Sequence, residues 1–334
     1  MKLRTGLLAA VVGVVALAAQ AAPDDPHYPM QWGLERVRAS EAWSVSKGEG
    51  IVVAIVDSGI DLSHPDLSGA IARDAQGKVL GRDFVDDDDD PTDEHGHGTM
   101  VAGIAGARTA NGIGVASVAP LIRLMPVRVL DGEAAGTSGD VDAGIRWAVD
   151  NGAHVVNLSL EIAREDAAGA GVAIVGSQAP DEAVRHAWRR GVVVVAAAGN
   201  DSSAFTDFDD STPVLLVGAS NREDGRASFS DTGRADAVVA PGVEIVSTWC
   251  DPCGGRAEHT YGQSEGTSYA APHVAGAVAL LLASGLGPDE AVERLRESAV
   301  DIGPAGPDGD TGRGRIDVAA ALGIASESPS RTPS

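Results

Sequence analysis

The sequence predicts an α/β fold: a doubly wound, mostly parallel sheet flanked by helices on both faces, in a single domain. Two patterns predict it. From residue 51 onward, continuous runs of Val, Ile, Leu and Ala alternate with segments of helical periodicity. Strands of a parallel sheet are buried on both faces and have this uninterrupted apolar character. Strand followed by helix, repeated along the chain, is typical of right-handed crossover units.

The expected elements follow one another in order. We expect strands over Ile51–Val56, Ile122–Val129, His154–Leu158, Val192–Ala197 and Val214–Val217. We expect helices over residues 98–107, 138–150, 180–190 and 268–284. A further helix should begin in Gly-Pro-Asp-Glu, residues 287–290, because proline suits a first helical turn. Neither a repeat nor a linker interrupts this series, and functional side chains are expected where the parallel strands end.

Length and charge limit the classes of function. The 334 residues include 48 acidic and 25 basic side chains, so the formal net charge is 25 − 48 = −23. Nucleic acid and anionic membranes repel such a chain, so neither is an expected partner. With 44% apolar residues it has the composition of a folded protein. A chain of this length builds a core without needing cross-links.

The N-terminus has the pattern of a secretory signal peptide. Lys2 and Arg4 precede an apolar run that ends near Ala19, and Ala19-Gln20-Ala21 offers a small-residue cleavage site. A membrane anchor needs about 20 apolar residues, and this run is shorter. We therefore expect removal of residues 1–21, a domain over residues 22–325, and secretion without a membrane anchor. The Ser/Pro-rich segment 326–334 is expected to be a disordered tail.

Cys250 and Cys253 are the only cysteines, and their spacing is C-x-x-C. A redox motif would stand at a helix start after a strand, whereas residues 249–255 have the composition of a turn. A zinc site needs further Cys or His ligands, and only His259 is near in sequence. In the oxidising compartment that secretion implies, a local disulfide is the expected state.

Three short motifs carry the functional signal. Asp57 ends the first strand, His97 opens a helix in His-Gly-His-Gly-Thr, and Ser268 opens another in Gly-Thr-Ser-Tyr-Ala-Ala-Pro-His. Taken singly, the acid could cap a turn, the histidines could be surface residues or metal ligands, and the serine could cap its helix. Together they supply the carboxylate, imidazole and hydroxyl of a nucleophilic triad.

The chain order Asp, His, Ser is that of subtilisin and differs from the chymotrypsin and α/β-hydrolase orders. On these motifs the sequence resembles the subtilisin-like serine proteases (subtilases), and is closest to their thermitase-like branch. A fourth match, residues 192–201, places Asn200 where the family has its oxyanion-binding amide. The resemblance implies that Ser268 attacks the peptide carbonyl, His97 moves the proton and Asp57 orients His97. The Asn200 amide and the Ser268 backbone N–H would stabilise the oxyanion.

The resemblance also implies where substrate binds. The substrate-binding positions would be Ser159, Leu160, Glu161, Ala198 and Gly199. Here Glu161 stands where the family has glycine, beside the expected S1 and S4 pockets, and residues 162–178 lengthen the next connection.

These substitutions leave specificity open. Three further acids lie in the segment that follows Asn200: Asp207, Asp209 and Asp210. With Glu161 they could favour Lys or Arg at P1 through charge pairing. Alternatively, all of these carboxylates point to solvent.

Calcium is the expected cofactor, at one or two structural sites. Seven carboxylates crowd into residues 83–93, and clustered hard oxygen ligands suit calcium; the alternative is a solvated, repelling loop. The segment resembles the thermitase-type calcium loop, which implies the ligands Asp83, Asp86, Asp88, Asp90 and Thr92. The family's tight site implies a second set: Asp25, Asp66, Asn111 and the carbonyls of Arg108, Ile113 and Val115.

One departure from the family concerns folding. Subtilases usually carry an inhibitory pro-segment, and none fits between the leader and Asp25-Pro26-His27-Tyr28, which already resembles a mature start. Folding is then expected to rely on calcium or on a chaperone in trans.

The expected function is that of a monomeric, secreted endopeptidase acting on proteins or peptides. A catalytically silent scaffold on the same fold is the alternative. The G-x-S-x-G at residues 262–266 matches an esterase motif, but that fold needs Ser, acid and His in this order. Only Glu265 stands between Ser264 and the last histidine, His273, so an esterase is disfavoured.

Overall fold

The computed structural model describes residues 22–160, 173–175, 179–204, 208–251, 253 and 258–325. The expected leader, the expected tail, Glu161 and Asp207 lie outside this part of the chain. Within it, no helix is both long enough and apolar enough to cross a bilayer.

Seven strands form the central sheet, and every neighbouring pair in it is parallel. Their order is β2 (Arg82–Asp83), β3 (Arg123–Arg128), β1 (Val52–Asp57), β5 (Val155–Leu158), β7 (Val193–Ala197), β8 (Leu215–Ser220) and β9 (Val238–Pro241). The parallel α/β sheet predicted from the apolar runs is confirmed. The two edge strands, β2 and β9, are additions to the prediction.

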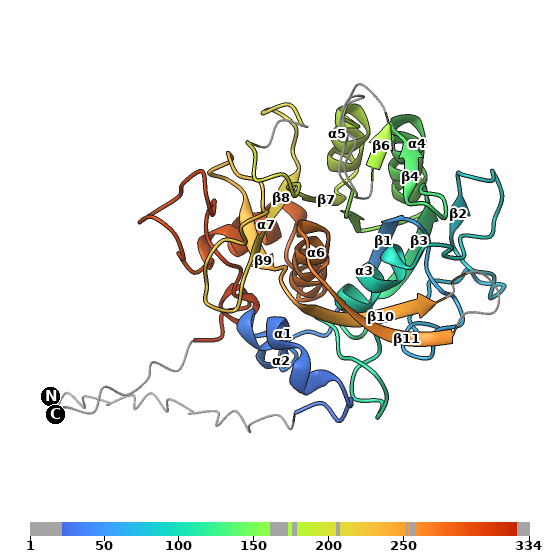
Figure 1. Cartoon of the computed structure of the whole chain (residues 1–334), viewed down its shortest axis with the longest axis horizontal. Coiled ribbons are helices and arrows are strands. Elements are labelled where there is room, and N and C mark those ends of the chain that lie inside the picture. Colours follow the sequence, from blue (N-terminus) through green and yellow to red (C-terminus); the bar gives the residue numbers. More distant parts are fainter. Residues whose placement is uncertain are drawn as a thin grey trace, which may run out of the picture.

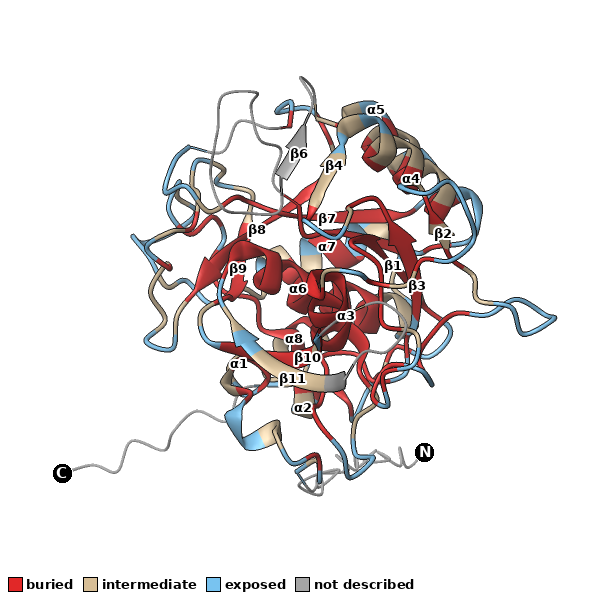
Figure 2. Ribbon diagram, turned by 45° about the vertical axis from the view of Figure 1, so that its right-hand side comes forward, coloured by how far each residue is buried: buried red, intermediate tan, exposed pale blue. Residues whose placement is uncertain are grey.

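Helices cover both faces of this sheet (Figure 1). One face carries α3 (His97–Gly106) and α6 (Thr267–Ala283), and the other α4 (Ser138–Asp150) and α5 (Asp181–Arg189). Strand β1 supplies both cores by alternation: Val53 and Ile55 belong to the first, and Ala54 and Val56 to the second. Helix α6 is buried along most of its length (Figure 2), as its uniformly apolar sequence requires.

Shorter elements complete the chain. They are η1 (Tyr28–Met30), α1 (Trp32–Arg36), α2 (Ala39–Ala42), the parallel pair β4 (Ala135–Thr137) and β6 (Ala173–Val175), α7 (Pro288–Glu297) and α8 (Val318–Ala321). Helix α7 begins at the proline that predicted it.

An antiparallel hairpin packs against α3. It consists of β10 (Ile245–Asp251) and β11 (Glu258–Ser264). Trp249 pairs with Thr260 and Cys250 with His259, so the interpretation of residues 249–251 as a turn is wrong. The cysteine spacing and the following Asp-Pro obscured a strand that carries β-favouring Ile, Val, Thr and Trp.

The sheet order decides where functional residues meet. Strands β1, β5 and β7 are neighbours and parallel, so their carboxyl ends lie at one edge. Asp57 ends β1, Ser159 follows β5, and residues 198–200 follow β7.

Candidate active site

Asp57 and His97 form a buried acid–imidazole pair at this edge. Asp57 is the last residue of β1 and His97 the first of α3. His97 Nδ1 lies 2.7 Å from Asp57 Oδ1, and the two side chains are 5% and 0% exposed. The carboxylate acceptor holds the imidazole proton on Nδ1, so Nε2 keeps the lone pair that a general base needs.

A glycine allows α3 to approach Asp57 closely. A Cβ at Gly98 would lie 2.1 Å from the carbonyl oxygen of Gly59 and 3.2 Å from Asp57 Oδ1. Any larger residue would push the helix, and His97 with it, away from β1.

Asp93 anchors the start of α3. This residue is completely buried. Its Oδ1 accepts hydrogen bonds from the Gly96 N–H and the Ser58 hydroxyl, both at 2.9 Å, while its Oδ2 accepts from the Thr99 N–H at 2.9 Å and hydroxyl at 2.6 Å. The Ser58 N–H in turn donates to Asp57 Oδ1 at 2.8 Å. Burial raises the pKa of Asp93, although these donors counteract it.

The environment of His97 favours its charged form. Burial by itself lowers the pKa of His97, but the charge and hydrogen bond of Asp57 and the charge of Asp93 outweigh it. The net pKa is above the ordinary value of 6.5. The site therefore stabilises the imidazolium that a base becomes when it accepts a proton.

Ser268 lies in the first turn of α6, where backbone N–H groups have no helical acceptor. The next residue, Tyr269, has its ring centroid 5.5 Å from that of His97, so this helix start lies beside the imidazole. The Ser268 hydroxyl donates to the carbonyl oxygen of Ser159 at 3.1 Å. The structure thus gathers Asp57, His97 and Ser268 at one edge, with the hydroxyl directed to the segment that follows β5.

Asn200 is held through its amide oxygen. Its Oδ1 accepts from the Thr267 N–H at 2.8 Å and from the Thr267 hydroxyl at 3.1 Å. Since both donors occupy the oxygen, the NH₂ group is left to donate elsewhere. The backbone N–H of Ser268 is one residue further along the same helix start.

The expected substrate-binding residues border this helix start. Ser159 and Leu160 are buried, and the Ser159 hydroxyl donates to the Ser268 carbonyl at 2.7 Å. From the other side, the Gly199 N–H donates to the Thr267 hydroxyl at 3.2 Å. Ala198, which precedes Gly199, is buried at the end of β7.

The acids after Asn200 bear on specificity. Asp209 is exposed, accepts the Ser211 N–H at 2.8 Å and lies 3.8 Å from an Arg185 nitrogen. Its charge is therefore directed to Arg185, which agrees with the solvent-facing alternative for this residue. Asp210 is exposed as well.

The chain is similar to known proteins. Residues 48–314 match the model of the subtilase family. The chain belongs to the subtilase family. Members of this family are subtilisin-like serine endopeptidases, and the chain is one of them.

Its relatives agree with that assignment. The thermophilic serine proteinase of Bacillus sp. (strain AK1) is 41% identical over 288 residues, which span 85% of this chain and 65% of that protein. Thermitase of Thermoactinomyces vulgaris is 39% identical over 265 residues, 79% of this chain and 86% of that one. Among solved structures, a protease from Pseudoalteromonas arctica PAMC 21717 gives a TM-score of 0.77 at 30% identity, covering 92% of this chain and 100% of that chain.

The second expected calcium set lies together and fits a cation. Asp25 and Asp66 are 2% and 0% exposed. Burial and the nearby charge of Asp66 raise the pKa of Asp25, although hydrogen bonds from backbone N–H groups partly counteract them. Asn111 bridges them: its N–H donates to Asp25 at 3.2 Å and its amide to Asp66 at 2.9 Å. No lysine or arginine of the described residues pairs with either acid. Among the described residues, no donor bonds to the carbonyl oxygens of Arg108, Ile113 and Val115.

The acidic loop pairs two of its expected calcium ligands with an arginine. Arg128, 4% exposed at the side chain, donates to Asp83 at 2.6 Å, Asp86 at 2.9 Å and Glu94 at 2.5 Å. No three carboxylates of the described loop come within 4.8 Å of one another. A guanidinium from the end of β3 therefore neutralises Asp83 and Asp86, two of the five expected ligands.

The other acids of this loop are also engaged. Asp87 pairs with Arg82, and Asp89 with Lys78 and Arg82. Two of the expected ligands bond within the loop, Asp88 to the N–H of Asp90 and Asp90 to the N–H and hydroxyl of Thr92. Calcium ligation by Asp83, Asp86, Asp88, Asp90 and Thr92 stays a prediction, and it would have to displace these ion pairs and hydrogen bonds.

Sequence reasoning missed two residues of this region. Asp93 was counted among the loop acids, although an aspartate just before a helix start is a recognisable cap for free N–H groups. Arg128 ends a buried strand opposite Asp57, and a cation in such an apolar run is a signal for a buried ion pair. Cys250 and Cys253 are joined by a disulfide.

Proposed function

We propose that this subtilase is a secreted serine endopeptidase that hydrolyses protein and peptide substrates through Ser268, His97, Asp57 and Asn200. The observation that carries the proposal is the buried His97–Asp57 hydrogen bond beside the helix start that presents Ser268. A catalytically silent scaffold would gain nothing from this pair, because burying an acid and an imidazole costs free energy. Buried titratable pairs of this kind are typical of functional sites.

Substrate binding itself would release the nucleophile. Without substrate, the Ser159 carbonyl oxygen accepts a hydrogen bond from the Ser268 hydroxyl. A peptide that adds as a strand beside Ser159 would offer its own backbone N–H to that oxygen. The Ser268 hydroxyl would then turn to Nε2 of His97, so the base engages the nucleophile when substrate is in place.

The chemical steps then use the groups in turn. Ser268 Oγ forms a bond to the peptide carbonyl carbon while its proton passes to His97 Nε2, and Asp57 stabilises the imidazolium. The oxyanion accepts hydrogen bonds from the Asn200 amide and the Ser268 N–H. His97 returns the proton to the leaving amine, which leaves an acyl-enzyme that water hydrolyses with His97 as base.

Calcium would stabilise the fold at the site of Asp25, Asp66 and Asn111. Two observations support this assignment: no lysine or arginine of the described residues neutralises the buried carboxylates, and three nearby carbonyl oxygens accept no hydrogen bond from the described chain. Calcium prefers six to eight such oxygen ligands. It would supply charge neutralisation and tie the N-terminal segment to the loop after α3, while the chain's own residues perform the catalysis.

The test is hydrolysis of a chromogenic peptide by purified protein in calcium buffer. Ser268→Ala should lower turnover by about 10⁶-fold, and Asn200→Ala by about 10²–10³-fold. Asp209→Asn is the matched control, because this acid contacts Arg185 and Ser211 and should leave turnover unchanged. Equal hydrolysis by wild type and Ser268→Ala, both folded by circular dichroism, would contradict the proposal.

A further inference from the structure

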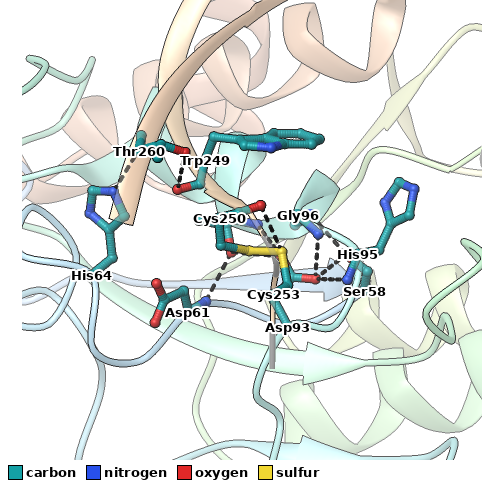
Figure 3. The surroundings of a disulfide bond; sticks show 12 residues. Ser58, Asp61, His64, Asp93, His95, Gly96, Trp249, Cys250, Cys253 and Thr260 are labelled. Carbon is teal, nitrogen blue, oxygen red and sulfur yellow. Dashed lines mark hydrogen bonds between the residues drawn. A yellow bond between two sulfur atoms is a disulfide. The ribbon is translucent and has the colours of Figure 1, made fainter. Parts of the chain in front are cut away.

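The disulfide Cys250–Cys253 lies against the start of the catalytic histidine's helix (Figure 3). Cys250, near the end of β10, is 1% exposed, while Cys253 in the following connection is half-buried. Cys250 Sγ lies 3.8 Å from the Thr99 hydroxyl. Ligand atoms of Asp93, Cys250 and Cys253 all lie within 4.8 Å of one another. The bond is therefore in the same cluster as the aspartate that anchors α3.

We propose that reduction of this disulfide by a small thiol unmasks a binding site for a thiophilic divalent cation such as Zn²⁺. The two cysteine thiolates and the Asp93 carboxylate would be its protein ligands. In the reduction, two thiols are oxidised to one external disulfide and the Cys250–Cys253 bond is replaced by two thiols. Metal binding then releases the two thiol protons.

The ligand chemistry suits such a cation. C-x-x-C is the spacing with which many zinc sites hold two of their ligands, and zinc takes carboxylate oxygen beside sulfur. Three anionic groups within 4.8 Å would repel one another strongly in a buried place. A bound divalent cation removes that repulsion. Three protein ligands leave a fourth tetrahedral position for water, which the half-buried side at Cys253 admits.

The bond is accessible to reduction. A thiolate attacks one sulfur of a disulfide directly, and Cys253 is the more exposed of the two residues. The disulfide closes a loop with only two residues between its cysteines, and cross-links that close short loops stabilise a fold least. The protein therefore has little to lose in global stability when this bond opens.

Metal binding would act on the catalytic pair through Asp93. The carboxylate oxygens that would ligate the metal hold the N–H groups of Gly96 and Thr99, which flank His97. Drawing Asp93 into a metal shell would weaken those bonds and shift His97 relative to Asp57. This consequence, but not the metal site itself, depends on the proposed peptidase function.

Metal binding is measured on the full chain carrying Ser268→Ala, which prevents self-digestion. Cd²⁺ is the probe, because thiolate–cadmium charge transfer absorbs in the ultraviolet. The protein is reduced with a phosphine, which is then removed by anaerobic gel filtration. A thiol assay verifies two free thiols per chain, and the protein is titrated with Cd²⁺ in excess calcium. The expected result is one Cd²⁺ per reduced chain and no such band in the oxidised chain.

Two further variants identify the ligands. Cys253→Ser leaves one thiolate, so it should lower the charge-transfer band by at least half. Asp93→Asn should weaken Cd²⁺ affinity by at least about tenfold, because loss of even an outer-shell partner of a metal site typically costs about that much affinity. A reduced, folded protein that shows no band would overturn the proposal, as would unfolding on reduction. Unchanged affinity in Asp93→Asn would overturn the assignment of the third ligand.

The effect on the active site is measured separately in the Ser268 enzyme. Zn²⁺ should slow fluorophosphonate labelling of the reduced enzyme at least about tenfold, and a zinc-selective chelator should restore the rate in excess calcium. Oxidised enzyme and reduced Cys253→Ser are the controls that should show no zinc effect. If the enzyme is not labelled at all but the Cd²⁺ titration gives the expected result, the peptidase function is contradicted and the metal site is still supported.

Discussion

Ser159 and Ser268 exchange two hydrogen bonds. The Ser159 hydroxyl donates to the Ser268 carbonyl at 2.7 Å, and the Ser268 hydroxyl donates to the Ser159 carbonyl at 3.1 Å. The first bond has a cause in the sequence: Pro272, four residues after Ser268 within α6, lacks the N–H that would bond that carbonyl. The proline thus frees the Ser268 carbonyl oxygen to accept the Ser159 hydroxyl, which ties the segment after β5 to the start of α6.

This pairing predicts coupling between positions 159 and 272. Ser159→Ala should lower the free energy of unfolding by about 1–3 kcal/mol, because it leaves the Ser268 carbonyl buried without a donor. In a Pro272→Ala background the loss should be smaller, since alanine restores a helical N–H. Urea unfolding of both variants and the double variant, in Ser268→Ala protein, measures this coupling. Additive losses would contradict it.

The pH dependence of cleavage should report the raised pKa of His97. The base must be neutral to accept the Ser268 proton, so kcat/KM should fall as pH falls through that pKa, which lies above 6.5. Asp57→Asn removes the negative charge that raises the pKa of His97, so the fall in kcat/KM should move to lower pH. Turnover should also drop about 10⁴-fold. Full pH profiles of both proteins check this. A limb that stays in place in Asp57→Asn would rule out Asp57 as the cause.

Calcium should stabilise the chain through Asp66 and Asp25. At a calcium concentration of 100 times Kd, the gain is about 2.7 kcal/mol, so chelation should lower Tm. Asp66→Asn should abolish the calcium dependence, whereas Asp209→Asn, with its exposed acid, should retain it. Thermal unfolding with and without chelator in Ser268→Ala protein tests this. A wild-type Tm that does not change on chelation would contradict the calcium site of Asp25 and Asp66.

Arg128 should be worth more to stability than Arg82. Arg128→Gln leaves the buried Asp83 without its cation, which costs about 3–5 kcal/mol. Arg82→Gln breaks pairs with the exposed Asp87 and Asp89 and should cost less than about 1 kcal/mol. Urea unfolding of the two variants compares them. Equal losses would show that Arg128 is not the counter-ion of the loop.

The parallel sheet could be predicted because its signal is local. Runs such as Val193–Ala197 are apolar without alternation, and only burial on both faces suits them. The positions of Asp57, His97 and Ser268 followed from the same reasoning, since each stands at a strand end or helix start. Their hydrogen bonds come from segments far apart in the chain, and only three-dimensional structure places them together.

The acidic loop and the hairpin could not be predicted for the same reason. The carboxylates of residues 83–93 look alike in sequence, but the cation that pairs with Asp83 and Asp86 is Arg128, which comes from β3. Cys250 belongs to a strand only because β11 pairs with it. Asp93 reaches the disulfide from more than 150 residues away, so its place in that cluster has no local signature.

Fluorophosphonate labelling, with the adduct mapped by mass spectrometry, tests the central claim most directly. The reagent reacts with a serine only when an adjacent base and an oxyanion site activate it. The account predicts one adduct, on Ser268, that disappears in His97→Ala. A folded wild-type chain that remains unlabelled, or an adduct that persists in His97→Ala, would contradict it.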